Sequence, residues 1–211
     1  MKTIDFYNKL NSMHEKDYIE NFLTYSTSLV IAGIKPAVTI ALSEQNKKLF
    51  KSWKHFGRDF VDKLSLNYIE LRNTSKSTIL MIYDKDVLQK RLTKESVQQF
   101  LIELGYPKTL DIHSYINKLK LRYEKYHCPH ELGLFLGIPI EDVKDFMNCT
   151  PKECLLCGYW KVYNNLHEAK NTFDKYDMIK EYTIQSILQG KLSHDVAFKI
   201  KNYSFSLSNV N

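Results

Sequence analysis

Apolar residues recur every three or four positions along most of the chain, which is the spacing of an amphipathic helix. Ile4, Tyr7 and Leu10 follow this spacing at the start of the sequence. The helical spacing of residues 15–32 ends at Gly33, because glycine commonly ends helices. The spacing predicts helices over residues 2–12, 15–32, 44–64, 85–92, 94–104, 109–126 and 166–189.

Three segments follow the patterns of strands. Residues 67–72 alternate between polar and apolar, and residues 78–83 are continuously apolar, with a turn-like Asn-Thr-Ser-Lys between them. Residues 159–163 form an aromatic third strand, and residues 37–42 are either a short buried strand or the start of a helix. The sequence therefore predicts a helix-rich α+β fold with a small, mainly antiparallel sheet.

Length and composition fit one compact domain. The chain has 211 residues with only seven glycines and five prolines, which disfavours a loop-rich all-β fold. We expect a single domain over residues 1–203. Residues 204–211 are polar and are expected to form a frayed tail.

A capping box is present at residues 150–153, Thr-Pro-Lys-Glu, with proline at the first helical position. It predicts a short helix, after two others that begin near Pro129 and Pro139. Cys154 and Cys157 would then lie on the same face of this helix, because they are three residues apart.

The charge pattern fits the predicted helices. The net charge is +6, and the basic residues are interrupted by apolar ones, as on a solvated helix face. Nucleic-acid binding is therefore not favoured.

Neither a secretory signal nor an apolar stretch long enough to span a membrane is evident, so we expect a cytoplasmic protein with no membrane partner. Its cysteines should be thiols, metal ligands or plain core residues, and not disulfides.

The four cysteines give a weak metal signal. A structural zinc site usually needs two Cys-x-x-Cys pairs, and this chain has one, Cys154 and Cys157. Thioredoxin-like chemistry needs a strand before such a pair and a helix after it, which is the reverse of the predicted order. We expect the cysteines to be structural and the protein to hold no metal. Were a metal bound, its ligands would come from Cys149, Cys154, Cys157 and His127.

The chain contains no P-loop, dinucleotide-binding, zincin or hydrolase-elbow motif. The best candidates for chemistry are an acid, a base, an aromatic wall and a lysine in a rigid turn. They predict a pocket for an anionic or aromatic small molecule, formed by Lys35, His130, Glu131, Tyr159 and Lys161.

Because His130 and Glu131 are adjacent, they cannot share one helix face; one could orient a ligand while the other packs or caps. The pattern names neither a cofactor nor a reaction, so an enzyme and a binding protein both stay open. Two alternatives also remain: a non-enzymatic protein-interaction module with a tyrosine-rich surface, and a Cys/His metal or thiol-redox site.

Three sequence blocks carry a family resemblance: AGIKPA at 32–37, PHELGLFLGIPIEDVKDFM at 129–147 and CGYWKVY at 157–163. They resemble a bacterial family of uncharacterised proteins, a domain of unknown function, whose members share PHE-[IL]-G-x-FLG-x-P-x-EDV and GYWKVY blocks. The resemblance covers about residues 24–189 and implies a cytoplasmic bacterial protein, but no established activity. The position of Cys128 is often a large apolar residue in that family, which weakens any zinc site built on it.

Overall fold

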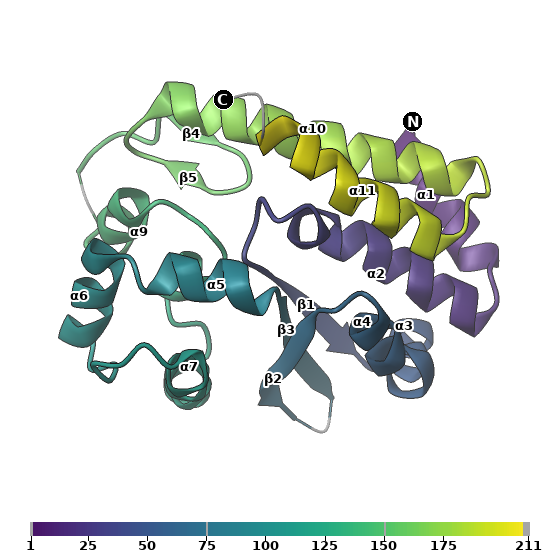
Figure 1. Cartoon of the computed structure of the whole chain (residues 1–211). Coiled ribbons are helices and arrows are strands. Elements are labelled where there is room, and N and C mark those ends of the chain that lie inside the picture. Colours follow the sequence, from purple (N-terminus) through teal and green to yellow (C-terminus); the bar gives the residue numbers. More distant parts are fainter. Residues whose placement is uncertain (1, 75, 150, 209–211) are drawn as a thin grey trace. The chain divides into compact units, whose positions relative to one another are not determined.

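The protein is described by a computed structural model over residues 2–74, 76–149 and 151–208 (Figure 1). The chain divides into two compact units. Unit 1 comprises residues 1–84 and 177–211, and unit 2 comprises residues 85–176. Each unit buries its own apolar residues, so the expectation of a single domain over residues 1–203 stays a prediction.

Unit 1 contains a three-stranded antiparallel sheet in the order β1-β3-β2. The central strand is continuously apolar because both of its faces are covered, and Leu80, Met81 and Ile82 are fully buried. The strands predicted at 67–72 and 78–83 and the segment at 37–42 all belong to this sheet. The helix-rich α+β class is confirmed. The strands are β1 (Ala37–Ser43), β2 (Asn67–Asn73) and β3 (Ser77–Tyr83).

Helices make up the rest of unit 1. Within it, α2 and α11 run side by side (Figure 1). The predicted helix at 44–64 is a continuous run of three pieces, the middle one a π-helical turn, η1. The helices are α1 (Lys2–Ser12), α2 (Glu15–Ile31), α3 (Lys47–Ser52), η1 (Trp53–Gly57), α4 (Arg58–Lys63), the second part of α10 (Leu166–Leu188) and α11 (Ser193–Ser208).

The C-terminal helix was not predicted. α11 extends to Ser208, into the range 204–211 that we expected to be a frayed tail. Residues 209–211 lie outside the described residues.

Unit 2 is built from short helices and a small hairpin. The strand predicted at 159–163 is reduced to β5, which pairs with β4 in a separate two-stranded antiparallel sheet and does not join the sheet of unit 1. The elements are α5 (Lys85–Leu92), α6 (Glu95–Glu103), α7 (Ile112–Tyr126), α8 (Leu132–Phe135), α9 (Ile140–Met147), β4 (Leu156–Cys157), β5 (Lys161–Val162) and the first part of α10.

The helix predicted from the capping box is wrong. Thr150 lies outside the described residues, and residues 151–155 are not helical. The backbone N–H of Leu155 donates to the carbonyl of Val162 at 2.8 Å, so pairing with β5 replaces helical bonds. Cys154 and Cys157 therefore lie at the start of a hairpin and not on a helix.

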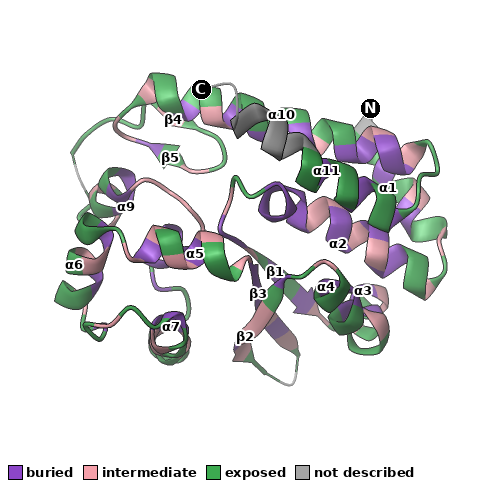
Figure 2. Ribbon diagram, in the orientation of Figure 1, coloured by how far each residue is buried: buried purple, intermediate pink, exposed green. Residues whose placement is uncertain are grey.

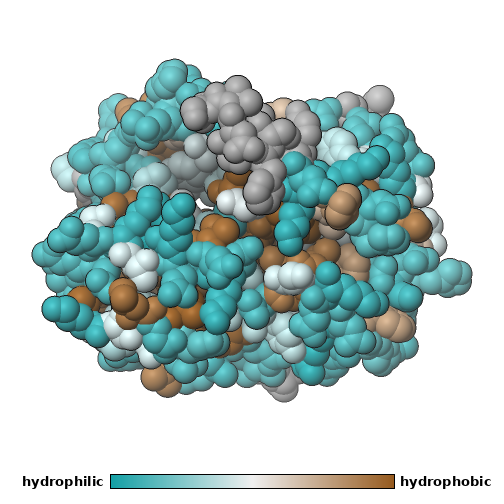
Figure 3. Space-filling view, viewed as in Figure 1, coloured by the Kyte–Doolittle hydropathy of each residue, from teal (hydrophilic) through white to brown (hydrophobic). Residues whose placement is uncertain are grey.

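The distribution of side chains is that of a globular protein. Buried residues line the inner faces of the helices and strands within each unit (Figure 2). The face viewed in Figure 3 is mostly hydrophilic, with small apolar areas between the polar side chains. Across the described residues, no helix is both long enough and apolar enough to cross a membrane.

Candidate functional site

The candidate site lies within unit 2 and depends on Asp142, on α9. This carboxylate is only 3% exposed and accepts four hydrogen bonds. One oxygen accepts from the backbone N–H groups of Tyr163 and Asn164, at 2.9 and 3.0 Å, and from the Asn164 amide at 2.9 Å. The other accepts from the Trp160 indole N–H at 2.8 Å. Such charge-assisted bonds fix the end of the β4–β5 hairpin against α9.

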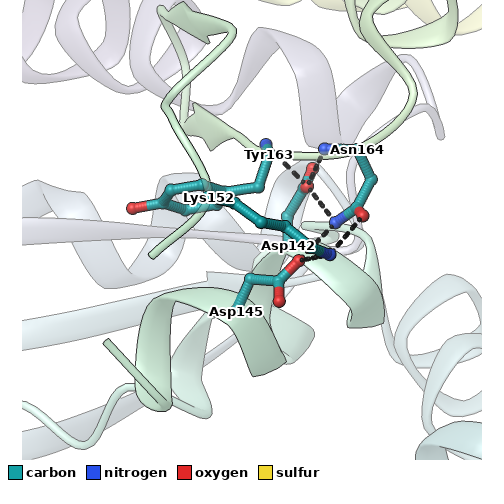
Figure 4. Close-up of polar contacts among 5 residues, drawn as sticks. All are labelled: Asp142, Asp145, Lys152, Tyr163 and Asn164. Atoms are coloured by element: carbon teal, nitrogen blue, oxygen red, sulfur yellow. Dashed lines mark hydrogen bonds and ion pairs between the residues drawn. The ribbon is translucent and has the colours of Figure 1, made fainter. Parts of the chain in front are cut away.

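A second carboxylate strengthens the same connection (Figure 4). Asp145 lies one turn after Asp142 on α9 and forms an ion pair with Lys152 at 2.7 Å. It also accepts from the Asn164 amide at 2.9 Å, and Lys152 donates to the Asn164 side-chain oxygen at 3.1 Å. Both sides of the hairpin are thus connected to one face of α9.

Aromatic rings attach the hairpin to α10. The Trp160 and Phe173 rings meet edge to face with 4.5 Å between centroids, and Tyr159 contacts the rings of Phe173 and Tyr176 at 5.4 and 4.9 Å. The backbone itself comes close: a Cβ at Gly158 would lie 2.4 Å from the Phe173 ring. Only glycine fits there without displacing this ring.

These connections leave a pocket of about 270 Å³ between the segment that contains α8 and α9 and the hairpin. Its lining is mainly apolar, with a small number of polar groups. The lining residues are Cys128, Pro129, His130, Leu132, Gly133, Leu136, Ile138, Asp142, Val143, Phe146, Tyr159, Trp160 and Lys161.

Two exposed polar side chains of this lining meet at the same aromatic ring. The His130 ring packs edge to face on Phe146, with 4.9 Å between ring centroids. The Lys161 ammonium lies 5.7 Å from the centre of the same Phe146 ring. Phe146 is 40% exposed, so its ring, a basic imidazole and a cation are together accessible at the pocket.

Glu131 does not line the pocket. It is 1% exposed, pairs with the Arg122 guanidinium and accepts a hydrogen bond from the Tyr106 hydroxyl at 3.1 Å. Burial and this carboxylate hold the pKa of Tyr106 well above its ordinary value, so Tyr106 stays a donor. The hydrogen bond to Glu131 raises the pKa of Arg122. Glu131 directly precedes α8, which begins at Leu132. Its contacts with Arg122 and Tyr106 therefore fix the start of α8, whose residues Leu132 and Gly133 line the pocket.

Lys35 belongs to unit 1 and follows the end of α2. Gly33 has a φ of +68°, and the N–H groups of Ile34 and Lys35 both donate to the carbonyl of Leu29, at 3.2 and 3.1 Å. This turn ends the helix in the way that glycine permits. Burial lowers the pKa of Lys35. The structure thus brings together three of the five predicted site residues: His130, Tyr159 and Lys161.

The cysteines are not in the core. All four are exposed. The sulfur atoms of Cys154 and Cys157 lie 3.1 Å apart. His127 is exposed after α7. Within residues 2–74, 76–149 and 151–208, no three His, Cys, Asp or Glu side chains are grouped as metal ligands would be.

Sequence reasoning missed two residues of the pocket, Asp142 and Phe146, and also Arg122, which pairs with Glu131. Asp142 and Phe146 are four residues apart on a helix, so they share a face. That spacing, together with the aromatic block at 157–163, was a usable signal that Asp142 and Phe146 contribute to the same site. Arg122 gave none, because its partner Glu131 is separated from it by a helix end.

Neither the curated proteins nor the solved structures include a match to this chain. A match to a family described as "Protein of unknown function (DUF3793)" covers residues 23–197, which is most of the chain and includes the whole pocket. The chain therefore belongs to the DUF3793 family.

Proposed function

We propose that this protein binds a small aromatic or apolar molecule bearing one anionic group, in the pocket beside the β4–β5 hairpin. The observation that carries the proposal is the convergence of His130 and Lys161 on the Phe146 ring above an otherwise apolar lining. As the resemblance implies, its place of action would be the bacterial cytoplasm. The proposal concerns binding and assigns no chemical step.

The charges of the lining favour an anion. Asp142 also borders the pocket, but its two oxygens already accept four hydrogen bonds, so its charge is committed to the hairpin. Lys161 is exposed and lies on the aromatic side of the pocket. A ligand carboxylate would meet the lysine there, and a protonated His130 would add to the attraction.

The size limits the ligand. Ligand pockets usually start at about 300 Å³, so a cavity of about 270 Å³ suits a single ring with a short substituent. Most of the affinity would come from the buried ring, since exposed ion pairs are worth about 1 kcal/mol or less. The lysine would therefore govern the choice between charged and neutral ligands more than the total affinity.

The two tryptophans give a direct test, because Trp160 lines the pocket and Trp53 lies buried in η1 of unit 1. Benzoate, phenylacetate, benzamide and benzylamine would be titrated while the two indole N–H signals are followed by NMR. We expect the two carboxylates to move the Trp160 signal and leave the Trp53 signal in place. The neutral and cationic probes should act more weakly.

A matched pair of lysines sharpens the test. Lys144 on α9 lies 4.9 Å from the Phe100 ring and does not line the pocket, whereas Lys161 lies against Phe146. Lys161→Met should reduce the preference for benzoate over benzamide, and Lys144→Met should not. Equal effects of the two substitutions, or a Trp160 signal unmoved by every probe, would contradict the proposal.

A further inference from the structure

Two thiols lie in contact beside the pocket, one just before β4 and one at the end of β4. The Sγ atoms of Cys154 and Cys157 are 3.1 Å apart, and both residues are exposed to solvent. We propose that Cys154 and Cys157 are a reversible modification site. A low-molecular-weight disulfide such as oxidised glutathione would oxidise the two thiols to an intrachain disulfide between them.

The backbone holds the two thiols in place. The N–H of Leu155 donates to the carbonyl of Val162 at 2.8 Å, and the N–H of Gly158 donates to the carbonyl of Trp160 at 3.1 Å. The Cys154 thiol also contacts the carbonyl of Leu156 at 3.3 Å. Since paired backbone flanks the two cysteines, little chain entropy remains to be lost when a bond forms between them.

The chemistry requires only a small disulfide as oxidant. The thiolate of one cysteine attacks a sulfur of oxidised glutathione and expels one glutathione thiolate, which leaves a mixed disulfide on the protein. The thiolate of the other cysteine then attacks the protein sulfur of that mixed disulfide and expels the second glutathione thiolate. Two protein thiols are oxidised, one glutathione disulfide is reduced, and the two protons pass to the two released thiolates.

The environment indicates a site that is modified, and not an oxidoreductase. Reactive Cys-x-x-Cys pairs owe their acidity to positions such as a helix N-terminus. Here Cys154 precedes β4 and Cys157 ends it, and the hydrogen bond between the two thiols raises the pKa of Cys157, although the nearby charge of Lys161 opposes this. A thiol with a raised pKa exchanges slowly at neutral pH, which suits a response to oxidant and not rapid turnover.

The other two cysteines provide the control. Protein would be incubated with oxidised glutathione, alkylated, and mapped by peptide mass spectrometry. We expect two of the four cysteines to escape alkylation, joined as Cys154–Cys157, and dithiothreitol to restore them. A Cys128→Ser, Cys149→Ser variant should form the same Cys154–Cys157 disulfide as the wild type. Cys154→Ser or Cys157→Ser should instead retain one glutathione on the remaining cysteine of the pair.

Structural readout separates this site from the proposed ligand pocket. Because Cys157 precedes Gly158 and the turn that carries Trp160, oxidation should move the Trp160 indole N–H signal and leave that of Trp53 unchanged. This result needs no ligand, so it stands whether or not the pocket binds aromatic acids. Complete alkylation of all four cysteines after oxidant treatment, or a disulfide that includes Cys128 or Cys149, would overturn the proposal.

Discussion

The two units solve the problem of buried polar groups in different ways. In unit 1 two fully buried hydroxyls of α2 are satisfied within their own helix: Thr24 and Thr27 donate to the carbonyls four residues earlier, at 2.8 and 2.7 Å. In unit 2 the buried carboxylates of Glu131 and Asp142 connect separate elements. These threonines of unit 1 thus depend on their own helix alone, whereas the buried carboxylates of unit 2 depend on contacts between separate elements.

This difference also bears on function. A pocket bordered by short helices and a hairpin needs connections that hold these small elements at fixed positions. Asp142 and Glu131 provide such connections on two sides of the pocket, so the charges that stabilise unit 2 also shape its candidate site. The buried threonines of α2, by contrast, bond only to carbonyls of their own helix.

The largest effect is expected for Asp142→Ala. The substitution removes the acceptor for the Trp160 indole and for the N–H groups of Tyr163 and Asn164, which leaves buried donors without a partner. Breaking such a buried charged network costs about 3–5 kcal/mol. The free energy of unfolding should be measured by urea titration, with the Trp160 and Trp53 signals followed separately. An unchanged midpoint for Trp160 would remove the basis of the comparison between the units.

The second prediction concerns a charge buried in unit 1. Burial, and then the charge of Lys35, lower the pKa of Lys180 to about 8; its ammonium donates to the carbonyl of Tyr25 at 2.6 Å. Between pH 8 and pH 10.5 the unfolded chain binds this proton and the folded protein does not, so stability rises as the pH rises. The gain should approach about 3 kcal/mol.

Measurement of the unfolding free energy from pH 7.5 to pH 10.5 tests this directly. Lys180→Met should flatten the rise, while Lys144→Met, which removes an exposed lysine of unit 2, should leave it intact. If the wild type becomes less stable over this range, Lys180 is not the dominant titrating group of unit 1.

The third prediction compares two glycines, one from each unit. Gly158→Ala would force a Cβ to 2.4 Å from the Phe173 ring, so we expect overpacking to cost about 2 kcal/mol and to shift the Trp160 indole signal. Gly33→Ala meets no atom within 4 Å, but its φ of +68° is unfavourable for alanine and should cost about 1 kcal/mol. Thermal unfolding of both variants gives the ranking, and a greater loss for Gly33→Ala would reverse it.

The sequence was informative where local patterns decide the structure. The helix predicted at 15–32 is α2 (Glu15–Ile31), and the predicted hairpin is β2 and β3. The capping box at 150–153 misled, because Lys152 pairs with Asp145 and the following residues pair with β5. These partners are distant in the sequence, and tertiary contacts override a local helix signal.

The site was predicted only in part for the same reason. The histidine, tyrosine and lysine of the two sequence blocks do line one pocket. The pattern could not show that Glu131 faces Arg122 and Tyr106 instead of the pocket, since adjacent residues differ only in which side of a turn they occupy. Nor could it show that the cysteines are exposed, because their position depends on where the hairpin lies.

The smallest effect is expected for Thr27→Val on α2. Thr27 is fully buried, and its hydroxyl donates to the carbonyl of Leu23, which already accepts a bond within the helix. Valine has nearly the same shape and leaves no buried donor unpaired, so the free energy of unfolding should change by no more than about 1 kcal/mol. Urea titration read at Trp53 measures it under the conditions used for Asp142→Ala. A loss as large as that of Asp142→Ala would mean that the Thr27 hydroxyl does more than bond within α2, and the contrast between these threonines and the carboxylates of unit 2 would no longer hold.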